Sequence, residues 1–162
     1  MITRQSGTER SKRVGRTSDD DRVHVVTLVE SIGSGGAERV ALEIAVRLDA
    51  TRFRSTVCVT RIPHGRQMEG AARERREAHE RLAAESGVRV LALGRRTTWQ
   101  LWTWLPLVSM LLRERPAVIH GHMFGSNVWA VVIGRLTGVP CVVAHDHNAC
   151  DEPGHDDDLA AR

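Results

Sequence analysis

Two pairs of histidines stand at matching places in the sequence, and imidazole is the side chain best suited to ligand chemistry near neutral pH. The first pair is His120 and His122, and the second is His145 and His147, each separated by a single residue. Each pair falls at the carboxyl end of a short apolar run that predicts a β-strand. Since residues two apart in a strand point to the same face, each pair can present two imidazoles together.

Three interpretations of the histidine pairs stay open from the sequence. Two or three imidazoles could hold a metal ion, although no carboxylate ligand stands at an obvious spacing beside them. The rings could instead only hydrogen-bond to loop carbonyls. In the interpretation that we favour, the imidazoles line a ligand cleft and bind hydroxyls or phosphates, so we assign no metal ligand.

A glycine-rich segment is the third candidate site. Residues 33–38 (Gly-Ser-Gly-Gly-Ala-Glu) lie between a predicted strand and a predicted helix, where exposed N–H groups favour an anion such as phosphate. A dinucleotide-binding fingerprint would need glycine in place of Glu38 and an acidic residue after the second strand, where Arg61 stands. No lysine of a P-loop is near. NAD-dependent enzymes and P-loop nucleotide hydrolases are therefore disfavoured.

The elements that must position these residues alternate between strand and helix. Apolar β-branched runs predict five strands, and helical spacing predicts four helices, one kinked at Pro106 and another capped by Ser126. Repeated strand–helix–strand units imply an α/β, Rossmann-like parallel sheet with helices on both faces. Ligands bind such sheets at the carboxyl ends of the strands. The predicted strands are 23–29, 55–60, 88–93, 117–120 and 141–144, and the predicted helices are 37–48, 66–86, 97–115 and 126–137.

Composition restricts the class of protein. The 162 residues are 41% hydrophobic and 27% charged, with a formal net charge of +3, which fits one folded domain. We expect a disordered leader over 1–21, the domain over 22–150 and an acidic tail over 151–162. No apolar run is long enough to span a bilayer, no secretory signal opens the chain and the three cysteines form no disulfide framework. We therefore expect a cytoplasmic protein.

The arginine-rich chain also raises the question of nucleic acid. No aromatic residues are interleaved with the arginines for base stacking, so we expect no nucleic-acid partner. Three of the four tryptophans instead fall in one segment, Trp99–Leu112, with arginines at both ends. We expect its apolar side to pack on the sheet. Because tryptophan beside arginine is typical of membrane surfaces, the segment could also contact a membrane or a second protein.

Three segments in this order resemble the N-terminal domain of the family-4 retaining glycosyltransferases, in the group that builds exopolysaccharides and capsules. The resemblance covers residues 22–150. The segments are Gly35-Gly36-Ala37-Glu38-Arg39; Val118-Ile119-His120-Gly121-His122-Met123 with Ser126-Asn127; and Gly138-Val139-Pro140 leading to Ala144-His145-Asp146-His147-Asn148.

The resemblance implies the N-terminal, acceptor-side half of a two-domain GT-B fold that needs no metal and no cofactor. A C-terminal domain would bind a UDP- or GDP-linked sugar as co-substrate, and the acceptor would be a glycan or a lipid-linked glycan. By analogy His122 is the catalytic residue, close to the reacting centre of the donor sugar. The expected substrate-binding residues are Gly35, Gly36, Glu38, His120, Asn127, His145, His147 and Asn148.

This sequence departs from the family pattern because the donor-binding domain is missing. We therefore expect no activity from the chain alone, but sugar transfer when a donor-binding domain completes it, in the same product or as a partner subunit. Such an enzyme would be cytoplasmic or peripheral at the inner membrane. Two alternatives remain, a non-catalytic interaction module that docks through its tryptophans and a metal-dependent hydrolase built on the histidines.

Overall fold

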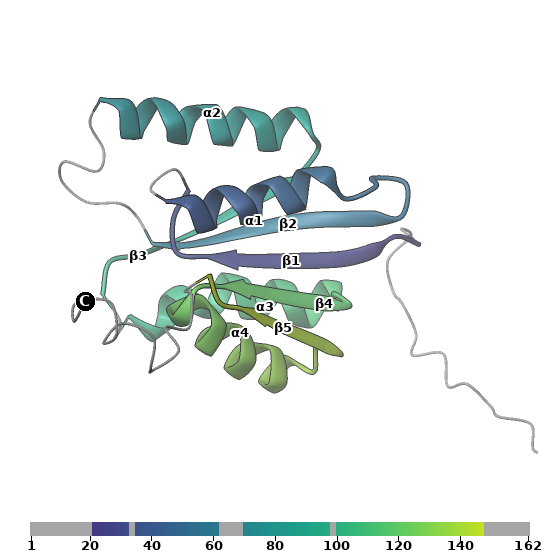
Figure 1. Cartoon of the computed structure of the whole chain (residues 1–162). Helices are drawn as coiled ribbons and strands as arrows, with labels where there is room; N and C mark the ends of the chain where they lie inside the picture. The colour runs from purple at the N-terminus through teal and green to yellow at the C-terminus, as the bar shows by residue number, and fades with distance from the viewer. Residues whose placement is uncertain (1–20, 33–34, 62–69, 98–99, 148–162) are drawn as a thin grey trace, which may run out of the picture.

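Five parallel strands form the centre of the protein, in the order β3-β2-β1-β4-β5. The computed structural model describes residues 21–32, 35–61, 70–97 and 100–147 (Figure 1). The predicted leader lies outside these residues except for Asp21, and the predicted acidic tail lies outside them entirely. The strands are β1 (Val23–Val29), β2 (Phe53–Arg61), β3 (Arg89–Arg95), β4 (Val118–His122) and β5 (Cys141–His145). The helices are α1 (Gly36–Arg47), α2 (Ala71–Glu85), the short 3-10 helix η2 (Leu101–Trp104), α3 (Leu105–Glu114) and α4 (Phe124–Thr137).

Helices cover both faces of the sheet, which confirms the predicted α/β, Rossmann-like class. In Figure 1, α1 and α2 lie above the sheet and α3 and α4 below it. Alternate residues of β1 supply two separate cores: Val26 and Leu28 pack with α3 and α4, whereas Val29 packs with α1 and α2. Burial on both faces explains why β1 is an almost continuous apolar run.

The carboxyl ends of three neighbouring strands lie close together. Leu28 of β1 pairs with Gly121 of β4, and His122 of β4 pairs with His145 of β5. Strand order reverses between β1 and β4. The chain adds β2 and β3 on one side of β1, and then adds β4 and β5 on the other side. A doubly wound sheet binds its ligand at such a reversal.

Two helix starts differ from the prediction. Pro106 does not kink a long helix, because η2 precedes it and Pro106 lies in the first turn of α3, where its missing N–H needs no partner. Ser126 is not the N-cap of α4. That helix begins at Phe124, after Met123 with a φ of 70°, and Ser126 is buried inside its first turn.

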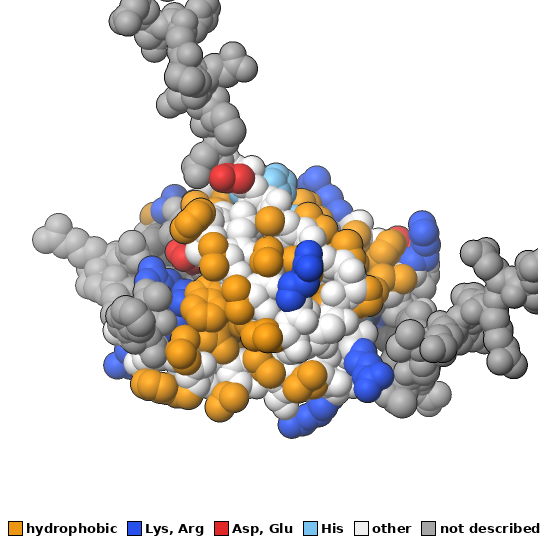
Figure 2. All heavy atoms as spheres, turned by 90° about the horizontal axis from the view of Figure 1, so that it is seen from below, with side chains coloured by type: hydrophobic (Ala, Val, Ile, Leu, Met, Phe, Trp, Pro, Cys, Tyr) orange, Lys and Arg blue, Asp and Glu red, His pale blue; other side chains and the backbone are white. Residues whose placement is uncertain are grey.

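The layer below the sheet leaves many apolar side chains in contact with solvent (Figure 2). Trp104 is buried and stacks on Trp129, with ring centroids 4.7 Å apart, so part of the tryptophan segment packs inward as predicted. Trp102 is 65% exposed, and Trp99 lies outside the described residues. In the part of the chain that the structure describes, no helix has the length and apolarity to cross a membrane.

Candidate functional site

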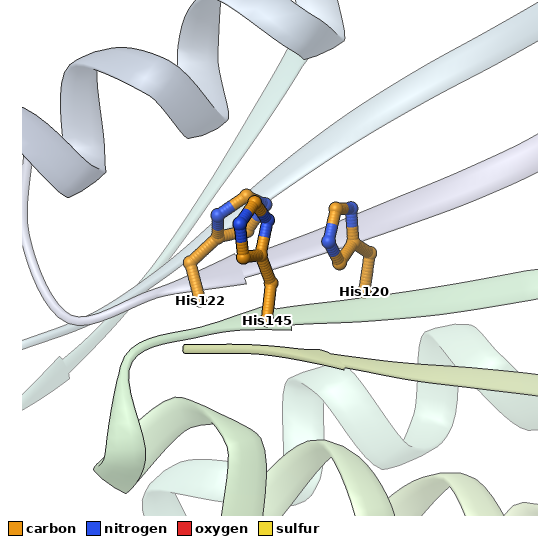
Figure 3. Close-up of side chains that lie close together, drawn as sticks. All are labelled: His120, His122 and His145. Carbon is orange, nitrogen blue, oxygen red and sulfur yellow. The ribbon is translucent and has the colours of Figure 1, made fainter. Parts of the chain in front are cut away.

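Four histidine rings form one cluster at the carboxyl ends of β4 and β5. Ring centroids lie 4.1 Å apart for His120 and His122 and 4.1 Å apart for His145 and His147, so both predicted pairs share a face. The two pairs also meet, since Nδ1 of His122 and Nε2 of His147 are 2.9 Å apart. Figure 3 shows three of the rings rising from the sheet into one space on the side of α1.

The inner imidazoles are neutral at physiological pH. Burial, followed by the neighbouring rings of His120, His145 and His147, lowers the pKa of His122 to about 3. Burial and the rings of His145 and His147 also lower the pKa of His120. Nε2 of His120 and of His122 is buried without a hydrogen-bond partner among the described residues. A ligand that offers a hydroxyl could satisfy these nitrogens, which are costly to leave unpaired.

The residues at the start of α4 hold the backbone of His145, and so position the cluster. Asn127 donates from Nδ2 to the backbone carbonyl of His145 (3.1 Å) and accepts from the backbone N–H of His145 at Oδ1 (3.2 Å). The backbone N–H of Met123 donates to the same carbonyl (3.0 Å). Asn127 was expected to line the ligand cleft, and the structure places its amide on the backbone of β5, where it holds His145 in position.

Gly121 allows α4 to lie against β4. A Cβ at this position would lie 2.9 Å from the backbone of both Ser126 and Asn127 and 2.8 Å from Oδ1 of Asn127. Packing therefore explains why glycine stands between the two histidines. It lets the first turn of α4 come close enough for Asn127 to reach β5.

The glycine segment opens α1, as the sequence predicted. Gly35 is the N-cap and Gly36 the first helical residue. The Glu38 carboxylate accepts a hydrogen bond from the Ser31 hydroxyl (2.8 Å), and a Cβ on Gly35 would lie 2.6 Å from its other oxygen. A carboxylate therefore lies at the helix N-terminus, where an anion would otherwise be favoured. Gly33, Ser34 and Asn148 lie outside the described residues.

Three charged residues near the same edge were not among the expected site residues. Glu30 follows β1, and its carboxylate lies 4.0 Å from Arg61 at the end of β2 and beside Gly125 in α4. Arg95 ends β3, is 3% exposed and places its guanidinium over the Trp104 ring at 5.0 Å. Each is a charged residue at or just after the end of an apolar strand. Applying the carboxyl-end rule to every strand would have found all three.

The same histidines could also bind a metal ion. One ring nitrogen from each of His120, His122 and His145 can be chosen so that all three lie within 4.8 Å of one another. Tetrahedral zinc with bonds of about 2.0 Å holds its ligands about 3.3 Å apart, which falls within this limit. No carboxylate joins these three nitrogens among the described residues.

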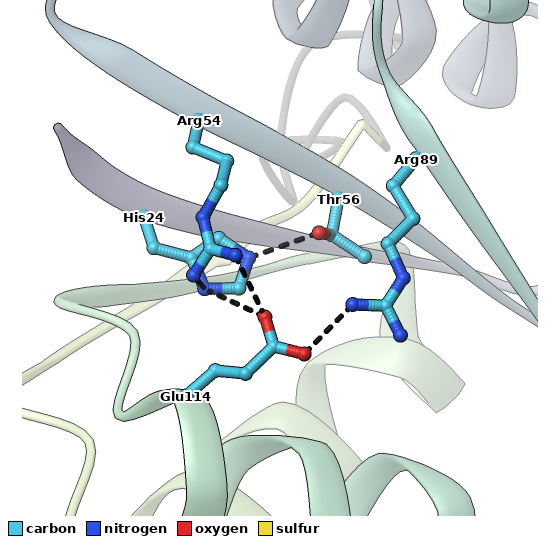
Figure 4. A network of polar contacts seen from close by, with 5 residues as sticks. All are labelled: His24, Arg54, Thr56, Arg89 and Glu114. Atoms are coloured by element: carbon cyan, nitrogen blue, oxygen red, sulfur yellow. Dashed lines mark hydrogen bonds and ion pairs between the residues drawn. The ribbon is translucent and has the colours of Figure 1, made fainter. Parts of the chain in front are cut away.

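A second polar cluster lies at the opposite end of the strands (Figure 4). Glu114, the last residue of α3, pairs with Arg54 (3.1 Å) and Arg89 (2.7 Å), and Arg54 lies 3.0 Å from Nδ1 of His24. Nε2 of His24 contacts the Thr56 hydroxyl (2.9 Å). These residues tie α3 to the amino ends of β1, β2 and β3. We therefore interpret this cluster as structural.

Comparisons with known proteins give one family match. The family model described as Glycosyltransferase Family 4 matches residues 34–158. No curated protein matches the chain significantly. Among solved structures, Alr3699/HepE from Anabaena, in complex with UDP and glucose, is 18% identical with a TM-score of 0.48, and the match covers 75% of this chain and 29% of that one. A universal stress protein family protein from Arabidopsis thaliana with AMP bound is 14% identical with a TM-score of 0.46, over 82% and 96% of the two chains.

Proposed function

The chain belongs to Glycosyltransferase Family 4, and from this premise we propose that it is the acceptor-side half of a retaining GT-B enzyme. The completed enzyme transfers a sugar from a UDP- or GDP-linked donor to a polysaccharide or lipid-linked acceptor. A C-terminal domain or a partner subunit supplies the donor site. The chain spans 29% of the length of Alr3699/HepE, so the activity of a whole transferase is part of the proposal.

The observation that supports this function is the pair of neutral imidazoles, His120 and His122, within the histidine cluster beside the strand reversal. His120 and His122 each offer a buried Nε2 without a hydrogen-bond partner in the described residues. A sugar presents several hydroxyls that both donate and accept, so it can match an imidazole in either tautomer. The cluster contains no group that would repel a neutral sugar, and it lies at the edge where doubly wound sheets bind ligands.

His122 acts by positioning in this proposal. A histidine with a pKa of about 3 is a weak base at neutral pH, so proton abstraction by His122 would contribute little. Its Nδ1 lies 2.9 Å from Nε2 of His147, and its own Nε2 is buried without a hydrogen-bond partner among the described residues. Transfer then depends on orientation of the donor sugar and on stabilisation of the leaving diphosphate. Gly35 and Gly36 bring the backbone of α1 close to the same edge.

The test is sugar transfer by this chain joined to a donor-binding domain, assayed with a panel of UDP- and GDP-sugars and a membrane lipid extract as acceptor. We expect transfer by the joined protein and none by the chain alone. His122→Ala should reduce kcat at least about a hundredfold if the ring contacts the transition state. His79→Gln is the matched control, because His79 lies on α2 and should leave kcat unchanged.

Two results would contradict the proposal. The joined protein could transfer no sugar from any donor in the panel, or His122→Ala could transfer as fast as the His79→Gln control. The intact mass of the endogenous product decides which form to assay. A mass of at least twice 18.0 kDa means that a donor domain is in the same chain, and a mass near 18.0 kDa directs the search to a partner subunit.

A further inference from the structure

The helices below the sheet carry a second apolar surface that faces away from the core. We call it the α3–α4 face and define it by the large apolar side chains of η2, α3 and α4 that are exposed. The most exposed are Leu136 (81%), Phe124 (76%) and Trp102 (65%). Figure 2 views the molecule from this side and shows hydrophobic side chains over much of it. The face consists of Leu101, Trp102, Leu105, Leu112, Phe124, Val128, Val131, Val132 and Leu136.

These residues are not needed to cover the sheet. α3 already buries Leu107, Met110 and Leu111 against it, and α4 buries Ala130 and Ile133. Both helices are thus apolar on their inner and outer sides. An ordinary solvent-exposed helix is polar on its outer side, and a large exposed apolar patch marks a surface that binds something.

The charges on these helices are almost all positive. Residues 100–145 contain a single carboxylate, Glu114, and Arg54 and Arg89 already engage it. Arg113 and Arg135 lie in the last turns of α3 and α4, both exposed, and Arg96 is exposed just before η2. An apolar surface bordered by arginines complements an anionic phospholipid membrane, whose headgroups attract each nearby arginine with about 1 kcal/mol.

We propose that the α3–α4 face docks on an anionic membrane surface, with its leucine, valine and aromatic side chains in the headgroup region. Trp102 suits this position, because tryptophan is enriched where an apolar phase meets water. Binding in the plane of the interface needs no membrane-spanning helix, and it gains strength from apolar burial and from charge together.

The face begins beside the histidine cluster, and here the inference rests on the proposed function. Phe124, which is exposed, is two residues from His122. α4 then extends for 14 residues, or about 21 Å, to Thr137. A docked α4 therefore holds the carboxyl edge of the sheet near the membrane, with the histidine rings on the side of the sheet that faces away from the bilayer. A lipid-linked acceptor can keep its lipid in the bilayer and extend its head group past the start of α4 and around this edge towards His122.

The experiment is flotation of the full chain with vesicles of phosphatidylcholine alone or mixed with phosphatidylglycerol. We expect binding to the mixed vesicles, much weaker binding to the neutral ones and loss of binding as salt is raised. Trp102→Ser with Leu136→Ser should weaken binding at least tenfold. Val40→Ser is the matched control, because Val40 is exposed on α1, on the other side of the sheet.

Arginine variants test the charge separately. Arg113→Gln and Arg135→Gln should each weaken binding about fivefold, the factor that corresponds to 1 kcal/mol. Arg75→Gln, on α2, should leave it unchanged. Circular dichroism of each variant confirms that it is folded, which is expected because every replaced side chain is exposed.

Three results would overturn the docking proposal. The chain could fail to float with anionic vesicles, the Trp102→Ser, Leu136→Ser variant could bind as well as the parent, or the same variant could abolish a dimer seen in solution, which would assign the face to a second copy. None of these readouts requires sugar transfer. Failure of docking is therefore distinguishable from failure of the proposed enzymatic function.

Discussion

His122 is the most unusual single residue of the described chain. It is 1% exposed, it contacts other imidazoles, and its Nε2 has no hydrogen-bond partner in the described part of the molecule. An unpaired buried nitrogen lowers stability by about 1–3 kcal/mol. In the proposed function, a ligand hydroxyl would supply the missing partner of this nitrogen.

The low pKa of His122 predicts how stability depends on pH. Its pKa is about 3 in the folded protein and 6.5 for an unperturbed histidine, so below pH 6.5 the unfolded chain binds a proton that the folded one excludes. The free energy of unfolding therefore falls as pH decreases below 6.5, by up to about 1.4 kcal/mol per pH unit for one proton. Urea denaturation of His122→Gln between neutral and mildly acidic pH should give a shallower decline. Parallel curves for the parent and His122→Gln would contradict this.

Replacement of Asn127 should make β5 less ordered around His145. Asn127→Ala removes both contacts to the His145 backbone and should lower stability by about 1–2 kcal/mol. Asn127→Asp keeps an acceptor for the His145 N–H but turns a carboxylate oxygen towards the His145 carbonyl oxygen, so it should destabilise the protein at least as much as the alanine variant. Amide hydrogen exchange at His145 provides the measurement. Equal protection in the parent and the alanine variant would show that Asn127 does not position the strand.

At the scale of helices and strands, the close packing of α4 on β4 positions the residues of the candidate site. Gly121→Ala should lower the free energy of unfolding by about 1–3 kcal/mol, because its Cβ would meet backbone atoms that cannot rotate away. Gly36→Ala is the matched control. A Cβ at that position meets nothing within 4 Å, and alanine in place of glycine in a helix gains about 0.5–1 kcal/mol. Chemical denaturation that ranks the two variants in the opposite order would refute this account of the packing.

The sequence predicted the positions of the strands more accurately than the residues at which the helices begin. All five strands were expected within a few residues, because each is an apolar run that the parallel sheet buries. The start of α4 was missed, since a local cap rule favoured Ser126, whereas packing on β4 sets the true beginning at Phe124. Local rules also failed at Pro106, where a 3-10 turn precedes the helix.

The candidate site was likewise predicted only where local sequence determines it. The spacing of each histidine pair predicted its shared face, but the meeting of the two pairs depends on β4 lying beside β5. The sequence marks Arg95 and Glu30 as charged residues at strand ends, but their contacts with Trp104, Arg61 and α4 depend on the fold. Asn127 was expected in the ligand cleft, and its contact with a backbone 18 residues later could not be predicted from local sequence.

For the whole molecule, the network around Glu114 joins α3 to three strands. Burial alone would raise the pKa of Glu114, but Arg89 and Arg54 outweigh it and lower that pKa. Glu114→Gln should therefore destabilise the protein by about 1–3 kcal/mol, since two arginines lose their shared carboxylate. Glu77→Gln, which breaks an exposed pair with Arg73, should lower the stability much less, because solvent screens that pair. Thermal or urea unfolding compares them, and equal losses would show that the network is no stronger than a surface pair.

The network lies at the amino ends of β1, β2 and β3, and the histidine cluster lies at the carboxyl ends of β4 and β5. Along β1, His24 of the network is three residues, or about 10 Å, from Thr27, which pairs with His120. Substitutions at that separation contribute to stability almost independently of one another. The carboxyl ends can therefore accumulate mutations while the amino ends maintain the fold. A library of variants confined to the positions around the histidines should for this reason contain many folded members.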